Sequence, residues 1–269
     1  MGTSKIKLAA MSTHWMNDPL WGGVGGDRFV PWLKEAKGAG YEGVTGLSGD
    51  FEPYFDNLGE LKKLLGEHGL GLAAVLIYGI DLNYDYYRRV CAFMGEMGCG
   101  SLMLIGGIGK EDGDLKNLAC VLDRIGEIAK AYGVGAVYHN HSGNSGETFG
   151  DMERLLSYTD PKKVGVMVDT GHATCDFRDL PDAPSRAVAF LKKYWERISC
   201  LEFKDFNAIT GLATPVGEGD CDFFAVAALL KEKNYTGWIT VEQNGPSLGR
   251  TSFECIKKSR EYIRKELGL

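Results

Sequence analysis

The sequence predicts a (β/α)₈ barrel, also called a TIM barrel, and three observations carry this prediction. Short apolar runs alternate with amphipathic helical patterns eight times in 269 residues, or roughly 34 residues per unit. The apolar runs are nearly continuous, as expected for strands with helices on one face and a packed interior on the other. Several helical patterns stop at a glycine just before the next strand. We therefore expect one domain over residues 1–269.

The first four units each pair an apolar run with a helix whose apolar residues recur three or four positions apart. Gly40, Gly69, Gly100 and Gly133 follow these helices and are candidates for positive-φ turns. The expected strands are 5–11, 41–48, 70–78 and 101–107, and the expected helices are 27–40, 57–69, 84–98 and 114–133.

The last four units repeat this alternation, but their strand runs end in histidine, acidic and lysine residues. Gly237 is the first residue of the final strand and a further turn candidate. The expected strands are 134–141, 163–172, 199–206 and 237–244, and the expected helices are 150–159, 183–198, 222–235 and 251–267.

A doubly wound open sheet is the competing architecture, and it usually carries a glycine-rich phosphate turn after its first strand. The loop at 12–29 contains glycines outside the G-x-G-x-x-G frame, and GGIGK at 106–110 lacks the Walker spacing. The sequence therefore favours the barrel.

Composition narrows the class of protein. The net charge of −6 argues against a nucleic-acid partner, which requires a basic surface. No apolar stretch reaches the roughly 18 residues that a membrane span requires. The seven cysteines are odd in number and lack C-x-x-C spacing, which favours reduced thiols in a cytoplasmic protein.

Polar and ionisable residues gather where the last four predicted strands end. In a barrel of this class, the carboxyl ends of the strands meet at one mouth and carry the chemistry. Burying any of these groups alone would be costly. The residues are His139 and His141, Asp169, Glu202 and Lys204, and Glu242 and Asn244, with His14 after the first strand.

Three carboxylates at one mouth would repel one another and raise each other's pKa, and a divalent cation resolves this conflict. With one imidazole, the expected ligands are His139, Asp169, Glu202 and Glu242. This donor set suits one ion, with Mn²⁺ as the expected metal and Mg²⁺, Co²⁺ or Zn²⁺ as alternatives. Two alternatives stay open: His141 replaces His139 as the ligand, or the carboxylates form salt bridges with Lys204.

Four segments resemble the sugar phosphate isomerase/epimerase superfamily, the xylose-isomerase-like TIM barrels. They are VYHNH, VMVDTGHA, LEFKDF, and PVGEGDCDF followed by GWITVEQN, and they lie within residues 134–244. The superfamily includes ketose 3-epimerases, hydroxypyruvate isomerase, inosose dehydratase and, more distantly, endonuclease IV. The resemblance implies a single metal held by Glu, Asp, His and Glu from strands five to eight.

This chain departs from that pattern twice, because His139 stands where the family has Glu and Glu202 where it has His. The exchange keeps the ligand inventory but removes one of the two glutamates that serve as matched bases in the epimerases. We therefore expect His141 to be the base and Glu242 to act on the opposite face. Lys204 is expected to bind a substrate hydroxyl or an oxyanion.

The resemblance further implies that His172 contacts substrate oxygens near the metal, and His14 and Asn244 are also expected to contact substrate. The predicted function is a metal-dependent isomerase/epimerase, or a β-eliminating dehydratase or lyase, acting on a sugar or keto-sugar. The DTGH segment and the lost glutamate favour the inosose dehydratase branch.

There are two alternatives. One is a subunit of a C-glycoside-cleaving lyase, which acts on 3-keto-glycosides as part of a hetero-complex. The other is a non-catalytic sugar-binding barrel. A phosphodiesterase like endonuclease IV is disfavoured, because the chain is acidic and has only five histidines. A homo-oligomer or a complex with a second subunit is expected.

Overall fold

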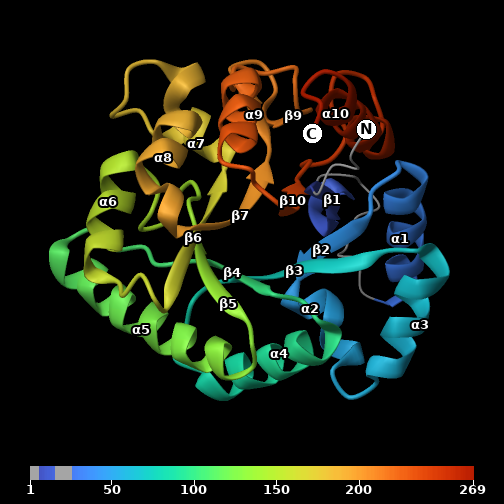
Figure 1. Cartoon of the computed structure of the whole chain (residues 1–269), viewed down its shortest axis with the longest axis horizontal. Helices are drawn as coiled ribbons and strands as arrows, with labels where there is room; N and C mark the ends of the chain where they lie inside the picture. The colour runs from blue at the N-terminus through green and yellow to red at the C-terminus, as the bar shows by residue number, and fades with distance from the viewer. Residues whose placement is uncertain (1–5, 16–25) are drawn as a thin grey trace.

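The computed structural model describes residues 6–15 and 26–269, and its centre is a closed barrel of eight parallel strands (Figure 1). Neighbouring strands follow the order β1-β10-β7-β6-β5-β4-β3-β2, so each strand lies beside its predecessor in the repeat and the last closes on the first. The predicted barrel is confirmed. Residues 16–25, part of the glycine-containing loop at 12–29, lie outside the described residues.

The barrel strands are shorter than the apolar runs that predict them. The prediction for the fifth strand ran to residue 141 and that for the sixth to residue 172, but pairing stops at His139 and Asp169. The residues beyond these points leave the sheet and turn into loops or helices at the barrel mouth. The strands are β1 (Ile6–Met11), β2 (Gly43–Leu47), β3 (Gly71–Tyr78), β4 (Ser101–Ile105), β5 (Gly135–His139), β6 (Val164–Asp169), β7 (Ile198–Phe203) and β10 (Gly237–Val241).

The expected helices surround the barrel (Figure 1). Gly69 closes one of them in the left-handed conformation, with φ of 60°. Another ends in the same way at Gly98 and not at Gly100, where the sequence placed the turn. The helices are α1 (Phe29–Gly38), α3 (Leu58–His68), α4 (Tyr84–Met97), α5 (Asp112–Ala131), α6 (Phe149–Tyr158), α8 (Arg186–Tyr194), α9 (Phe223–Glu232) and α10 (Ser252–Lys265).

Short elements at the mouth were not predicted. Helices α2 (Ser48–Phe51) and α7 (Thr170–Asp176) begin directly after β2 and β6. The hairpin of β8 (Asp205–Asn207) and β9 (Gly211–Thr214) follows β7, because Asp205 redirects the chain. The buried carboxylate of Asp205 accepts hydrogen bonds from four backbone N–H groups, those of residues 206, 217, 219 and 221.

Two apolar clusters hold the barrel. The larger lies between the strands and the surrounding helices, and the smaller fills the barrel interior. Two members of the interior cluster, Leu76 and Ile105, also line the cavity at the mouth. The members of the interior cluster are Met11, Ala74, Leu76, Met103, Ile105, Val137, Met167 and Cys200.

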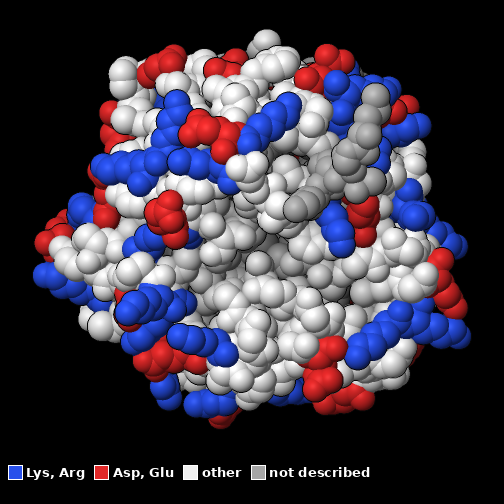
Figure 2. Space-filling model, viewed as in Figure 1, with Lys and Arg blue, Asp and Glu red and all other residues white. Residues whose placement is uncertain are grey.

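All seven cysteines are free thiols. In residues 6–15 and 26–269, no helix has both the length and the apolar character needed to cross a membrane. On the face shown in Figure 2, acidic and basic side chains are interspersed around the periphery, and the hollowed centre is largely uncharged.

Candidate metal and substrate site

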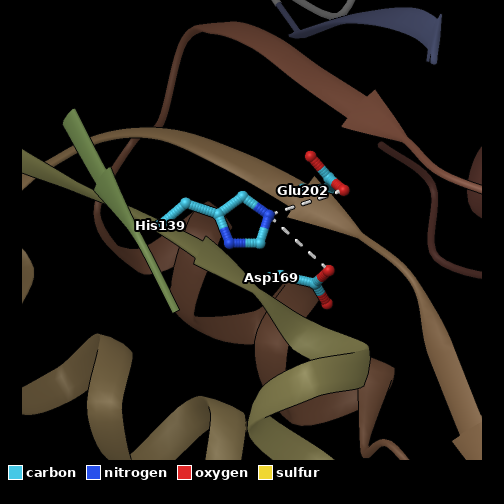
Figure 3. Close-up of side chains that lie close together, drawn as sticks. All are labelled: His139, Asp169 and Glu202. Carbon is cyan, nitrogen blue, oxygen red and sulfur yellow. Dashed lines mark ion pairs between the residues drawn. The ribbon is translucent and has the colours of Figure 1, made fainter. Parts of the chain in front are cut away.

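Three buried side chains converge from neighbouring strands at the barrel mouth (Figure 3). His139 ends β5, Asp169 ends β6, and Glu202 lies in β7 directly opposite Asp169 in the strand register. His139 Nε2 lies 3.9 Å from Asp169 Oδ2 and 3.8 Å from Glu202 Oε1. We call these three residues the cluster.

The cluster contains oxygen atoms that the protein itself does not satisfy. Asp169 Oδ2 and Glu202 Oε2 are buried without a hydrogen-bond partner among the described residues. Buried polar atoms are almost always paired, so these two oxygens are available to an ion or a ligand. Two carboxylate oxygens and one imidazole nitrogen fit a small divalent cation.

Burial dominates the electrostatics of the cluster. It raises the pKa of Asp169 to about 7 and raises the pKa of Glu202 well above its usual range, with the negative charge of Glu242 adding to the second shift. It also lowers the pKa of His139 to about 3, so this imidazole is neutral. Burial thus destabilises the anionic forms of the two carboxyls, and the imidazole beside them is neutral. A bound cation would stabilise both carboxylate anions.

Asp169 is held in place by its neighbours. The Asn140 amide donates to Asp169 O at 3.0 Å, and Asp169 N donates to Asn140 Oδ1 at 2.9 Å. The backbone N–H of His172 donates to Asp169 Oδ1, so this oxygen caps α7 while Oδ2 faces the cluster. The sequence predicts that Asn140 faces away from His139 and His141, but it does not indicate the two hydrogen bonds to the backbone of Asp169.

Glu242 is placed differently from the other predicted ligands. Its Oε2 accepts from Lys204 Nζ at 2.8 Å, and its Oε1 accepts from Thr13 Oγ1 at 2.9 Å. Asn244, with its amide oriented to satisfy both groups, donates to Glu242 Oε1 and accepts from Lys204 Nζ, each at 3.0 Å. The salt-bridge alternative therefore describes this carboxylate. We call Lys204 and Glu242 the ion pair.

The ion pair keeps both of its members charged. Burial alone would lower the pKa of Lys204, but the negative charges of Glu242, Asp169 and Glu202 outweigh it and raise that pKa. Burial alone would raise the pKa of Glu242, but the Lys204 ammonium, together with a contact to the neighbouring Glu202 carboxyl, holds it far below its usual range. An ammonium and a carboxylate thus lie beside the cluster.

His139 and Glu202 of the cluster and Glu242 of the ion pair line one cavity of about 280 Å³. Its size suits a small molecule, and its walls combine apolar and polar side chains, as ligand sites do. Its lining residues are Thr13, Leu47, Leu76, Tyr78, Ile105, His139, His141, Glu202 and Glu242.

His141 lines this cavity beyond the end of β5, as predicted. Its ring packs against that of His172 with centroids 4.1 Å apart and meets the edge of Tyr78 at 5.6 Å. Its Nδ1 lies 2.9 Å from Ser142 O and 3.2 Å from Asn144 Nδ2. The carbonyl is the closer of the two and favours a proton on Nδ1, which leaves Nε2 to act as an acceptor. Burial lowers the pKa of His141, so the ring is neutral.

His172 lies in α7, and its side chain is also buried. Its Nδ1 is surrounded by Ser142 and Asp176. Its Nε2 lies 3.9 Å from Asp169 Oδ2 and has no hydrogen-bond partner in the part of the chain that the structure describes. The structure therefore places His172 beside the cluster.

His14 is the predicted site residue that the structure places elsewhere. Its Nδ1 lies 3.1 Å from Met11 O and its Nε2 2.9 Å from Glu35 Oε2, and the ring is fully buried. Both nitrogens are engaged because the chain turns after β1 and directs the ring toward α1. Thr13 lines the cavity in its place, and only its position next to a strand end could have indicated this.

The chain is similar to two curated relatives along almost the full length of each. The inosose dehydratase of Clostridium beijerinckii is 26% identical over 307 aligned positions that cover 100% of this chain and 99% of the relative. The inosose dehydratase of Geobacillus thermodenitrificans is 28% identical and covers 99% of each chain.

The fold also matches solved structures. A sugar phosphate isomerase/epimerase from Parabacteroides distasonis superposes with a TM-score of 0.74 at 21% identity, over 96% of each chain. The model of the xylose isomerase-like TIM barrel family matches residues 33–266. The chain therefore belongs to the xylose isomerase-like TIM barrel family.

Proposed function

We propose that this chain is a divalent-metal-dependent dehydratase of a keto-sugar or an inosose. The observation that carries the proposal is the asymmetry of the cavity, where a neutral histidine face meets a charged Lys204–Glu242 pair. Elimination of water needs a base and a separate acid for the leaving group, whereas epimerisation works best with two matched bases. The inosose dehydratase relatives support the same reaction class.

The cluster is the proposed ion site, with His139, Asp169 and Glu202 as ligands and Mn²⁺ as the expected ion. When bound, the ion supplies Lewis-acid polarisation of the substrate carbonyl. Glu242 was predicted as the fourth ligand. Because both of its oxygens are already bonded, we assign it instead to the acid side of the cavity, where it keeps Lys204 protonated.

His141 is the proposed base. Its Nε2 accepts the proton from the carbon next to the carbonyl, and the electron pair of that C–H bond moves into the enolate. Lys204 is the proposed acid, because its ammonium donates a hydrogen bond to Glu242, and Glu242 lines the cavity. As the electron pair forms the C=C bond, the C–O bond to the β-hydroxyl breaks and Lys204 gives it a proton, so that water leaves.

Asn244 and His172 are proposed to contact the substrate oxygens, and the fixed positions of both support orientation of the substrate. We do not carry His14 into the site, because both of its ring nitrogens are engaged.

The test is a reaction of purified protein, loaded with Mn²⁺, with a panel of inososes and keto-sugars in D₂O. The proposal expects a product that is lighter by one water, and loss of activity in His141→Ala. A product that loses no water but carries one carbon-bound deuterium, and is therefore heavier by one mass unit, would instead identify an isomerase or epimerase. No turnover with or without added metal would contradict the proposal.

Other expectations stay predictions. They are the cytoplasmic location, the homo-oligomer or second subunit, and the lyase acting on 3-keto-glycosides.

A further inference from the structure

We propose that Asp176 is a positioning residue, which fixes the ring of His172 so that Nε2 presents an unshared electron pair to the cluster. Asp176 lies at the end of α7, one helical turn beyond His172, and both side chains are buried. Spacing of four residues places two side chains on the same helix face.

The contacts around Nδ1 favour a proton on that nitrogen. Asp176 Oδ2 lies 3.1 Å from Nδ1, and an ionised carboxylate can only accept a hydrogen bond. The Ser142 hydroxyl donates to the same Oδ2 at 2.5 Å, so its oxygen, 2.9 Å from Nδ1, is left to accept as well. Two acceptors therefore face Nδ1.

One contact opposes this arrangement. The backbone N–H of Ser142 lies 3.2 Å from Nδ1 and would favour a bare nitrogen there. The carboxylate contact is shorter and carries a charge, so it decides the tautomer as long as Asp176 is present. Without the carboxylate, the Ser142 N–H would become the stronger influence.

The other ring nitrogen then faces the cluster as an acceptor. His172 Nε2 is buried, lies 3.9 Å from Asp169 Oδ2, and has no hydrogen-bond partner among residues 6–15 and 26–269. A bare Nε2 can bind a cation or accept a hydrogen bond from a substrate hydroxyl, whereas a protonated Nε2 can do neither. A carboxylate that orients a histidine in this way typically contributes about 10- to 100-fold to metal affinity or activity.

The first experiment uses the ion-free protein with ¹⁵N-labelled histidine. Nitrogen chemical shifts distinguish protonated from bare ring nitrogens, and a His172→Gln spectrum assigns the signals among the five histidines. We expect a protonated Nδ1 and a bare Nε2 in the wild type, and a shift toward the opposite tautomer in Asp176→Asn. A wild-type ring with protonated Nε2 would overturn the proposal.

Asp179→Asn is the matched control. Asp179 lies three residues further along the chain and accepts from the backbone N–H groups of Phe149 and Gly150 at the start of α6, away from His172. This variant loses a structural carboxylate of the same type, so it should leave the His172 tautomer unchanged. An equal change in both variants would show a general structural effect and contradict a positioning role.

The second experiment measures Mn²⁺ affinity and steady-state kinetics, and it rests on the proposed function. We expect Asp176→Asn to lose about 10- to 100-fold in Mn²⁺ affinity if Nε2 meets the ion, or in kcat/KM alone if it meets the substrate. Unchanged values in both measurements, in an active enzyme, would overturn the proposal. The tautomer experiment needs neither metal nor substrate, so failure of the proposed function leaves it intact.

Discussion

The two halves of the barrel mouth hold similar residues in opposite states. In the cluster, two carboxylates of adjacent strands keep oxygen atoms that no described residue satisfies. In the ion pair, both Glu242 oxygens are bonded, to Lys204 and to Thr13. Burial raises the pKa of Asp169 and Glu202, while Lys204 lowers that of Glu242.

The two halves differ because Lys204 pairs with Glu242 and leaves Asp169 and Glu202 without a cationic partner of their own among the described residues. Lys204 follows Glu202 by two residues, yet its ammonium bonds Glu242, which directly follows the neighbouring strand β10. The backbone of Lys204 is held by Thr170, whose hydroxyl donates to Lys204 O at 2.7 Å. The protein thus supplies its own cation on one side of the cavity and leaves the other side open to an external one.

The largest expected effect concerns the ion pair. Lys204→Met should destabilise the ion-free protein by about 3–5 kcal/mol, because it leaves Glu242 buried without its partner. Adding Glu242→Gln should recover most of this loss, since the pair is then removed as a neutral unit. Urea unfolding of the wild type, both single variants and the double variant measures the coupling, and purely additive losses would show that the two residues do not interact.

The next effect concerns the cluster. Glu202→Gln keeps the shape of the side chain but removes its charge. Because a ligand itself is changed, Mn²⁺ affinity measured by titration calorimetry should fall by at least the roughly 10- to 100-fold that is typical for loss of a residue that only orients a ligand. The matched control is the Lys204→Met, Glu242→Gln double variant, which leaves the net charge of the mouth unchanged. Comparable losses in both proteins would make Glu242 a ligand and erase the difference between the halves.

A smaller effect is expected at Asn140, which supports the cluster from behind. Asn140→Ala removes two hydrogen bonds to the backbone of Asp169 and should destabilise the protein by about 1–3 kcal/mol while weakening Mn²⁺ binding. Asn244→Ala loses its partners on the ion-pair side, so its Mn²⁺ affinity should stay near that of the wild type. Thermal unfolding and ion titration of both variants check this, and a reversed order of affinities would contradict it.

The smallest effect is expected at Thr13. Thr13→Val removes one hydrogen bond to Glu242 and should cost about 1 kcal/mol of stability without changing Mn²⁺ affinity. Thr45→Val is the comparison, because Thr45 of β2 bonds Thr240 of β10 at 2.8 Å and neither residue is among those that line the cavity. We expect similar losses of stability in the two variants, but a lower kcat/KM only in Thr13→Val. Equal kcat/KM values in both variants would show that Thr13 is not part of the site.

The sequence predicted the barrel and the cluster because both depend on local patterns. Strand ends can be located from apolar periodicity, and parallel strands bring their carboxyl ends together, so the meeting of His139, Asp169 and Glu202 followed from the fold. The bounds of the strands were less accurate, since the sequence could not show that β7 ends before Lys204 and turns into a hairpin.

Contacts across the barrel could not be predicted from the sequence. Thr13 and Glu242 are 229 residues apart, and no pattern in either segment indicates their hydrogen bond. His14 was expected at the site, but the turn after β1 directs it to Glu35. Such outcomes depend on side-chain direction in the closed barrel, which residue spacing alone does not determine.

Anomalous diffraction from crystals soaked in Mn²⁺ tests the central claim most directly, because it locates the ion. We predict one anomalous peak within coordination distance of His139 Nε2, Asp169 Oδ2 and Glu202, with Glu242 still bonded to Lys204. The absence of a peak at these residues, or a peak coordinated by Glu242 after release of Lys204, would contradict this account.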